Sequence, residues 1–349
     1  MKDDLRQEKL NQLAPALVPW FQKNGRRLPW RENAIPYHVW LSEIMLQQTR
    51  IEAVKPYYAR FLQEIPDIAA LAAADPEKLQ KLWEGLGYYS RVRNLQTAAQ
   101  QIMTEYGGTF PDTWDEIRKL KGIGDYTAGA IASMCFNRPT PAVDGNVLRV
   151  LSRITGDARP ITDEKTRKAV RADLAAVYPV ENCGDFTQAI MELGETVCLP
   201  NSAPDCGRCP CRDFCTAADG SWEKYPVKAE KKARRREEYT VFLLYCGDGI
   251  AIRKRPEKGI LAGLWEYPNV PGGLTLPKVK AQLAAWDLDP ESVRKTETVM
   301  HIFTHVEWKM HCYEAVCRNR SETFVWVPAE ELETRIALPT AFRKIREEI

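Results

Sequence analysis

The sequence predicts a multidomain protein, with an all-α domain over residues 1–225 and a smaller α+β domain over residues 239–349. The first part reads as helices separated by short Pro and Gly breaks, with little of the alternation typical of strands. A charged run from Lys228 to Glu238 then precedes a region of strand-like patterns. We interpret residues 226–238 as a solvated connector between the two domains, and a phosphate-binding arm is the alternative.

The composition is that of an ordinary globular protein, with 44% hydrophobic and 28% charged residues in 349. A net charge of +2 does not indicate a polyanionic partner, so any nucleic-acid surface must come from local placement of Lys and Arg. The charged start lacks the apolar core of a signal peptide, and no run of about 18 apolar residues is present. We therefore expect a cytoplasmic chain with no membrane partner.

The stretch Pro36–Arg50 is predicted to be a helix, because Pro36 suits a first turn and no Gly or Pro follows. Helical spacing places Glu43 on one face with Trp40 and Ile44. Burial would raise the pKa of this carboxyl, which suits a general acid. The alternative is an ordinary Glu at the edge of a surface helix.

A Gly-x-Gly turn, formed by Gly122 and Gly124, lies within a predicted helix-turn-helix at about residues 114–131. Glycines there let backbone N–H groups approach a phosphate, and the helix starting near Tyr126 offers its positive N-terminus. A plain connection between two helices is the alternative.

Asp144 lies just before the helix predicted at about Asn146–Thr155, at an N-cap position. Free N–H groups and the helix dipole are expected to lower its pKa and keep it anionic. The pKa of Glu43 would then be raised and that of Asp144 lowered. Glu43 could donate a proton while Asp144 stabilises positive charge, as in glycoside cleavage.

Five of the ten cysteines lie within residues 198–215, and the expected lack of a leader argues against a disulfide framework. Four thiolates at such short spacing suit a 4Fe-4S cluster or a structural zinc ion, and both take thiolate ligands. The spacing leaves this choice open. Free buried thiols are the alternative.

The second part begins with a predicted β-hairpin, Tyr239–Tyr245 and Ile250–Arg255, around Gly-Asp-Gly. Further strands are expected at Val299–Thr304 and Trp308–Val316, with helices at Pro277–Trp286 and Ala341–Glu348.

Five features, taken in order, resemble those of the helix-hairpin-helix DNA glycosylases. They are Trp-Leu-Ser-Glu-Ile-Met-Leu-Gln-Gln-Thr, Gly-Leu-Gly-Tyr-Tyr, the Gly-x-Gly hairpin, Val-Asp-Gly-Asn-Val and the Cys group. Over nearly the whole chain the resemblance is to MutY-type adenine DNA glycosylases. It implies a monomer that acts on duplex DNA with adenine opposite 8-oxoguanine. It also implies a chiefly structural 4Fe-4S cluster, with ligands Cys198, Cys206, Cys209 and Cys215. The first Cys gap is one residue longer than the family's, and Cys211 could replace Cys209.

The resemblance also implies roles for individual residues around an adenine flipped out of the duplex. Glu43 would protonate the ring nitrogen, and Asp144 would stabilise the oxocarbenium sugar. The other implied positions are Tyr126 and Asn146 in the same pocket, Arg31 and Gln188 on the flipped base, Gln48 and Tyr88 in the base stack, Thr49 and Leu86 near the opposite base, and Gly122 and Gly124 on the DNA backbone.

Tyr126 stands where glycosylases with lyase activity carry a Lys that forms a Schiff base. A phenol cannot form an imine, so we expect base removal without strand cleavage.

The C-terminal domain resembles a Nudix fold but lacks the acidic cluster that a catalytic Nudix box needs after Pro268. We therefore interpret it as a lesion-recognition module. Within His301–His305, the resemblance implies that the Thr304 hydroxyl contacts 8-oxoguanine, with His305 beside it. Packing at a strand end is the alternative for the two His residues.

Two other functions fit some of these features. An endonuclease III-type glycosylase/lyase is opposed by Tyr126 and by the whole C-terminal third. A non-enzymatic iron–sulfur DNA-binding regulator would need neither Glu43 nor Asp144.

Overall fold

The computed structural model describes residues 2–229 and 233–347, which fold into two compact units. The first unit contains the chain up to Ala73 and again from Asn94 to the connector. The second contains Ala74–Arg93 together with the C-terminal sheet. The short segment Ala74–Arg93 therefore groups with the sheet, although it comes from the helical part of the sequence.

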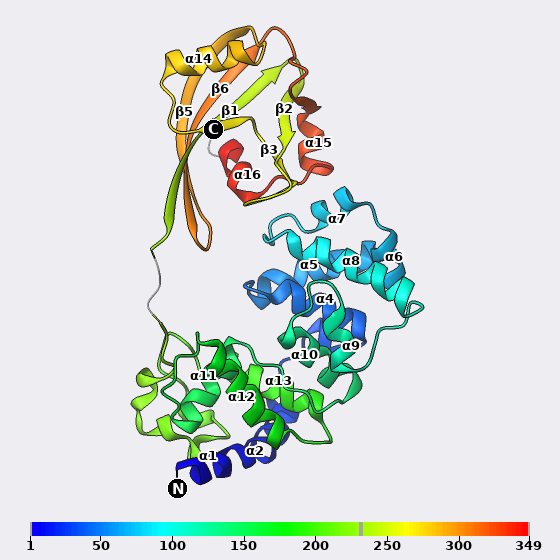
Figure 1. Ribbon diagram of the computed structural model, residues 1–349, viewed down its shortest axis with the longest axis vertical. Helices are drawn as coiled ribbons and strands as arrows, with labels where there is room; N and C mark the ends of the chain where they lie inside the picture. Colours follow the sequence, from blue (N-terminus) through cyan, green and yellow to red (C-terminus); the bar gives the residue numbers. More distant parts are fainter. Residues whose placement is uncertain (1, 230–232, 348–349) are drawn as a thin grey trace. The chain divides into compact units, whose positions relative to one another are not determined.

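The first unit is helical (Figure 1). Its helices are α1 (Lys2–Asn11), α2 (Leu13–Asn24), α3 (Pro29–Glu32), α4 (Pro36–Leu46), α5 (Ile51–Glu64), α6 (Ile68–Ala73), α8 (Ser90–Glu105), which starts in the second unit, α9 (Trp114–Lys119), α10 (Asp125–Phe136), α11 (Gly145–Thr155), α12 (Glu164–Val177) and α13 (Cys183–Thr196). The cysteine-rich loop forms the short 3-10 turns η1 (Cys206–Arg208), η2 (Arg212–Phe214), η3 (Thr216–Asp219) and η4 (Ser221–Lys224).

Helix α11 shows how the apolar spacing builds the core of this unit. Val147 and Leu151, one helical turn apart, are both buried in a cluster that includes Leu17 of α2 and Phe186 of α13. The helix begins at the Asp144 cap and ends where Gly156 takes a left-handed conformation, with φ of 69°. The cap and the apolar face therefore fix both the ends and the orientation of α11.

Helix α4 differs from its predicted extent, since it ends at Leu46 instead of continuing to Arg50. Gln48 has a φ of 60°, which an α-helix cannot accommodate, so the following residues form a turn into α5. The helix is not amphipathic either, because every residue from Val39 to Met45 is buried. Glu43 therefore lies inside the unit.

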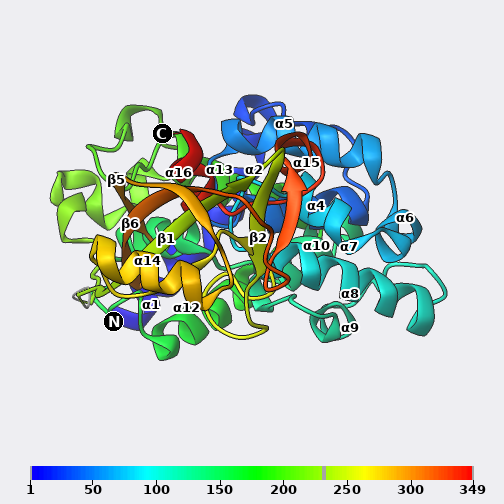
Figure 2. The ribbon, with the colours of Figure 1, turned by 90° about the horizontal axis from the view of Figure 1, so that it is seen from above.

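The second unit is built on a mixed sheet with helices on both faces (Figure 2). Its strands are β1 (Arg235–Cys246), β2 (Gly249–Lys254), β3 (Trp265–Glu266), β4 (Asn269–Pro271), β5 (Pro290–Ile302), β6 (Val306–Cys317) and β7 (Val325–Pro328), and its helices are α7 (Pro76–Leu82), α14 (Leu276–Ala285), α15 (Ala329–Thr334) and α16 (Thr340–Glu347). The strand order is β3-β2-β1-β6-β5, with β4 on β1 and β7 on β2, and among the strands of the described residues only β1 and β6 pair in parallel.

Alternation along β1 explains why both sheet faces are covered. Leu243 packs with Phe342 of α16, whereas its neighbour Phe242 packs with Val279 and Leu283 of α14. Successive side chains point to opposite faces of a strand, so a continuous apolar run fits a sheet buried on both sides.

The largest boundary differences from the sequence-based expectation in this unit are at β1 and β5, whereas β2, β6, α14 and α16 differ by one or two residues at their ends. The segment Arg235–Glu238, expected in the connector, is the start of β1, because its backbone pairs with β6 from Val306 onward. Strand β5 begins at Pro290 instead of Val299, and Thr304 lies in the turn after it. Residues 230–232 of the expected connector lie outside the described residues.

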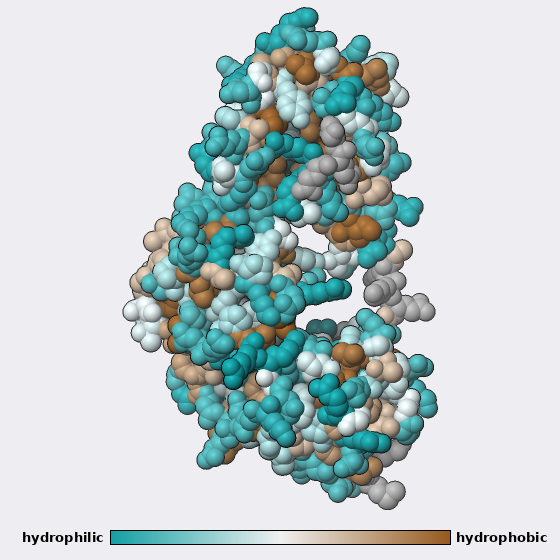
Figure 3. All heavy atoms as spheres, turned by 180° about the vertical axis from the view of Figure 1, so that it is seen from behind, coloured by the Kyte–Doolittle hydropathy of each residue, from teal (hydrophilic) through white to brown (hydrophobic). Residues whose placement is uncertain are grey.

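Hydrophilic side chains dominate the molecular face drawn in Figure 3, with hydrophobic ones scattered among them. Within residues 2–229 and 233–347, no helix combines the length and apolar character needed to cross a membrane.

The sheet core provides a stability test. Leu243→Ala removes a side chain that is 0% exposed between β1 and α16, so we expect a loss of about 2–5 kcal/mol in the free energy of unfolding of the sheet unit. Leu276→Ala, at an exposed Leu on α14, is the matched control and should change it by less than about 1 kcal/mol. Hydrogen exchange of sheet amides in the full chain measures both values. Equal losses in the two variants would contradict this packing.

Candidate active site

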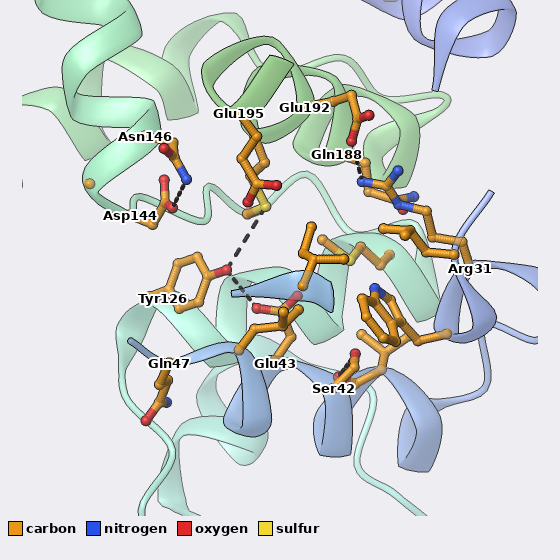
Figure 4. A pocket seen from close by; sticks show the side chains of 18 of the residues that line it. Arg31, Ser42, Glu43, Gln47, Tyr126, Asp144, Asn146, Gln188, Glu192 and Glu195 are labelled. Carbon is orange, nitrogen blue, oxygen red and sulfur yellow. Dashed lines mark hydrogen bonds and ion pairs between the residues drawn. The ribbon is translucent and has the colours of Figure 1, made fainter. Parts of the chain in front are cut away.

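A cavity of about 550 Å³ lies within the helical unit, walled by α3, α4, α10, α13 and the start of α11 (Figure 4). Seven residues singled out from the sequence line it, namely Arg31, Glu43, Gln48, Tyr126, Asp144, Asn146 and Gln188. They come from segments up to 157 residues apart in sequence, between Arg31 and Gln188. The fold therefore gathers the two carboxylates into one space.

Glu43 reaches the cavity from α4 and is only 6% exposed. The Tyr126 hydroxyl donates a hydrogen bond of 2.5 Å to its Oε2 atom. Burial raises the pKa of Glu43 to about 7, and the charges of Asp144 and Glu195 act in the same direction. The hydrogen bond from Tyr126 and the charge of Arg31 oppose the rise. A carboxyl with this pKa holds a transferable proton near neutrality.

Asp144 caps α11 as expected, since its Oδ1 accepts from the backbone N–H of Val147 at 2.7 Å. Its Oδ2 accepts from Asn146 Nδ2 at 2.9 Å. The expectation that capping lowers its pKa is wrong. Burial raises the pKa of Asp144 above its ordinary value, and the hydrogen bonds from Val147 and Asn146 only partly offset that effect.

The Asn146 amide is itself held in place. Its Oδ1 accepts from Arg149 Nη2 at 2.8 Å, and the same nitrogen donates to the Gly194 carbonyl at 2.7 Å. This leaves the Asn146 amide N–H directed at Asp144, so the carboxylate has a fixed orientation. Gly194 has no room for a side chain, because an added Cβ would lie 2.8 Å from Asn146 Cβ.

Arg31 lies on the wall opposite Asp144 in Figure 4 and is fixed by an ion pair. Its Nη2 lies 2.9 Å from Oε2 of Glu192, a carboxylate only 1% exposed in its side chain. Glu192 and its neighbour Glu195 also line the cavity, although neither was predicted from the sequence as a site residue. The spacing of Gln188, Glu192 and Glu195 along α13, roughly one helical turn each, is the signal that could have revealed them.

Thr49, Leu86, Tyr88, Thr304 and His305 do not line this cavity. Thr49 lies in the turn after α4. The other four line a separate cavity of about 780 Å³ in the second unit. There the hydroxyls of Tyr88 and Thr304 are hydrogen-bonded to each other.

Two residues implied to enter the base stack have unusual backbone conformations. Gln48 has a φ of 60° and Tyr88 a φ of 47°, and both are exposed. Left-handed conformations cost energy in non-glycine residues, and such strain clusters at functional sites. The strain therefore fits residues selected for contact with a ligand.

The two hairpin glycines differ in what they require. Gly122 has a φ of 78°, and an added Cβ would lie 2.6 Å from Asn94 Cβ, so the turn itself demands glycine. Gly124 has an ordinary extended φ of −93° and open space around its Cα. Only Gly124, at the N-terminus of α10, leaves room for a close approach by another molecule.

Cys198, Cys206, Cys209 and Cys215 line one small cavity of the helical unit, of about 20 Å³. Arg153 lines it too, with Nη1 at 3.2 Å from Cys198 Sγ. Cys211 does not line it and is fully buried in the apolar core. Among the described residues, no group of three or more His, Cys, Asp or Glu is placed to hold a single metal ion.

Comparisons with known proteins agree with this architecture. Residues 41–175 match the model of the HhH-GPD superfamily of base excision DNA repair proteins, and residues 240–348 match that of the NUDIX domain. Among solved structures, a thermostable thymine-DNA glycosylase gives a TM-score of 0.55 at 24% identity and covers 61% of this chain and 98% of its own. A trapped endonuclease III–DNA covalent intermediate gives 0.52 at 23% identity, covering 63% and 98%. These two likenesses show the fold alone.

Curated relatives extend further along the chain. The adenine DNA glycosylases of Rattus norvegicus and Homo sapiens are each 34% identical to it, covering 94% and 95% of this chain and 76% and 72% of their own lengths. The adenine DNA glycosylase of Buchnera aphidicola subsp. Schizaphis graminum is 31% identical and covers 95% of this chain and 96% of its own. The chain therefore belongs to the adenine DNA glycosylase family of helix-hairpin-helix base excision DNA repair enzymes.

Proposed function

We propose that this chain hydrolyses the N-glycosidic bond of adenine mispaired with 8-oxoguanine, or with guanine, in duplex DNA. The single observation that carries this proposal is the cavity in which Glu43 and Asp144 face a common space. Loss of a purine from a sugar needs a proton for the leaving base and a negative group for the positive sugar. The names of the curated relatives support adenine as the base.

The proposed reaction begins when adenine leaves the base stack and enters the cavity. The Glu43 carboxyl gives its proton to a ring nitrogen, and the bond from the sugar to the base breaks with its electron pair moving to the purine. The sugar is then an oxocarbenium ion, which the Asp144 carboxylate stabilises. Water adds to the sugar carbon and loses a proton, which leaves free adenine and an abasic site.

The raised pKa of Asp144 is compatible with this role. A positive sugar next to the carboxyl favours its ionised form, because opposite charges at short range lower a carboxyl pKa. The cap hydrogen bond and Asn146 hold the carboxylate in position before the charge develops. Such preorganisation stabilises a transition state with little rearrangement.

Base recognition is proposed for Arg31 and Gln188, which line the same cavity. Glu192 holds the Arg31 guanidinium, and the neutral Gln188 amide can both donate and accept hydrogen bonds. Gln48 and Thr49, in the turn after α4, are proposed to enter the opened base stack and to lie near the opposite base. The open backbone at Gly124 is proposed to contact a phosphate, with Gly122 shaping the turn.

Recognition of the opposite 8-oxoguanine is proposed for the cavity of the second unit, through Leu86, Tyr88, Thr304 and His305. Thr304 and Tyr88 offer hydroxyls that can donate or accept. Helix α14, in the region where a catalytic Nudix box would hold Mg²⁺, contains no Asp or Glu. Recognition is therefore a better assignment for this unit than pyrophosphate hydrolysis.

Strand cleavage is not part of the proposal. The group beside Glu43 on α10 is the Tyr126 phenol, and the residues that line the described cavity include no Lys. A Schiff base needs a primary amine. The cavity is also completed by one chain, which supports action as a monomer.

A 4Fe-4S cluster is proposed for the cavity lined by the four cysteines, in a chiefly structural role. The four cysteines surround one common space, and four thiolates at this spacing suit such a cluster. Cys198, Cys206, Cys209 and Cys215 would be its ligands, and Arg153 would offset their negative charge.

Glu43→Gln keeps the shape of the side chain but removes its acidic proton. We expect the single-turnover rate of adenine release from a duplex with adenine opposite 8-oxoguanine to fall about 10²–10⁴-fold. Glu52→Gln, at a Glu whose side chain is 80% exposed on α5, should leave the rate unchanged.

The wild-type product should show strand breaks only after treatment with alkali. Failure of the wild type to release adenine would falsify the proposed function, and breaks without alkali would indicate a lyase.

The rate should also depend on pH in a defined direction. The donor form of Glu43 exists below its pKa of about 7, so the single-turnover rate should fall as pH rises through 7, approaching tenfold per pH unit. The rate should also fall at low pH, where the Asp144 carboxylate becomes protonated. Because the pKa of Asp144 is raised, this fall should begin at a higher pH than an ordinary Asp would give. A rate that stays constant from pH 6 to about pH 9 would contradict a donor with this pKa.

The assignment of Cys209 over Cys211 can be tested without an activity assay. Cys209→Ala should abolish the visible absorbance and most of the bound iron of the purified protein. Cys211→Ala should retain both, because Cys211 faces the apolar core and not the cavity. The opposite result would assign Cys211 as the ligand.

A further inference from the structure

Helix α13 places a third carboxylate, that of Glu195, on the cavity that holds Glu43 and Asp144. Figure 4 shows its carboxylate projecting from α13 toward the side where Asp144 and Tyr126 lie. The side chain is 35% exposed, so it lies at the wall of the cavity and not in its depth. The reaction proposed above leaves this carboxylate without a role.

Arg26 fixes the position of Glu195. Its Nη2 lies 2.6 Å from Glu195 Oε2, while its Nε lies 2.5 Å from Oε1 of Glu192. Arg31 holds the other Glu192 oxygen at 2.9 Å. The guanidinium of Arg26 is thus bound on two sides, and charge-assisted hydrogen bonds of this kind are short and directional. Glu195 is therefore anchored and does not move freely like an ordinary surface Glu.

The charges of this cluster cancel. Arg26 and Arg31 contribute two positive charges, and Glu192 and Glu195 contribute two negative ones. Loss of the Glu195 charge would leave one positive charge in excess at the wall of the cavity. That position is unfavourable in the proposed reaction, since positive charge develops on both the protonated purine and the sugar.

Glu195 also acts on Glu43 through space. Its charge raises the pKa of Glu43 and of Tyr126. The other charged or titratable groups that face Glu43 include Tyr126 and Cys135 from α10, Asp144 before α11 and Arg31 from α3. Arg167 from α12 and Glu192 from α13 line the same cavity. Around Glu195 itself the facing groups are Arg26 and Arg149, together with Glu43 and Tyr126.

We propose that Glu195, anchored by Arg26, is a positioning residue of this glycosylase that keeps the wall of the cavity free of uncompensated positive charge, so that Glu43 holds its proton until the extruded base arrives. This inference rests on the proposed function, in which Glu43 is the proton donor. Glu195 does not touch the reacting atoms and acts through the electric field of the cavity. Its neutralisation should therefore change the pH at which Glu43 works more than the architecture of the site.

The test is the pH profile of single-turnover adenine release from a duplex with adenine opposite 8-oxoguanine. In wild type the rate falls as pH rises through the pKa of Glu43, and this fall is the alkaline limb of the profile. Glu195→Gln should move the alkaline limb to lower pH by about half a unit or more. At pH values above the limb, the variant should therefore react roughly threefold or more slowly than the wild type. Glu195→Asp, which keeps the charge, should retain the wild-type limb. The double variant Arg26→Gln with Glu195→Gln removes one charge of each sign and should move the limb back toward the wild-type position.

The outcomes separate the two proposals. If the wild type releases no adenine, the proposed function itself fails. If the wild type is active and Glu195→Gln keeps the wild-type limb, only the inference about Glu195 is overturned. A uniform loss of rate at every pH, which the charge-restoring double variant does not reverse, would show a purely structural role and would overturn it as well.

Discussion

The hydrogen bond from the Tyr126 hydroxyl to Glu43, buried between α4 and α10, is the interaction on which the site depends. It fixes the Glu43 carboxyl in a place where water does not stabilise its charge, so its pKa rises to about 7. The bond alone would favour the ionised form, and burial outweighs it. Without that burial the same two side chains would form an ordinary surface contact and would donate no proton near neutrality.

Asp144 is held by different forces and contributes differently. Its carboxylate is oriented by the helix cap and by Asn146, which Arg149 holds in turn. Both carboxyls have raised pKa values, so the division of labour proposed for them does not come from opposite shifts in the free protein. In the proposed reaction, the division of labour comes from the part of the substrate that each carboxyl faces. Glu43 faces a basic ring nitrogen, and Asp144 faces a positively charged sugar.

Much of this could be predicted from local sequence patterns. The cap at Asp144, the apolar face of α11 and the hairpin of β1 and β2 depend on residues close together in the chain, and the fold class was confirmed. The early end of α4 was not predictable, because Gln48 carries no local signal for a positive φ. Strand β5 begins at Pro290 through its pairing with β6, although its polar residues lack apolar alternation. The raised pKa of Asp144 and the roles of Glu192 and Glu195 depend on neighbours that only the tertiary fold supplies.

The central claim is that burial keeps Glu43 protonated near neutral pH in the DNA-free protein. Carbon-13 NMR of the Glu43 carboxyl, assigned by its loss in Glu43→Gln and followed through a pH titration, measures this directly. The account predicts a midpoint of about 7. A midpoint near the ordinary glutamate value of about 4.3 would contradict it, because Glu43 would then be ionised before any base reached the cavity.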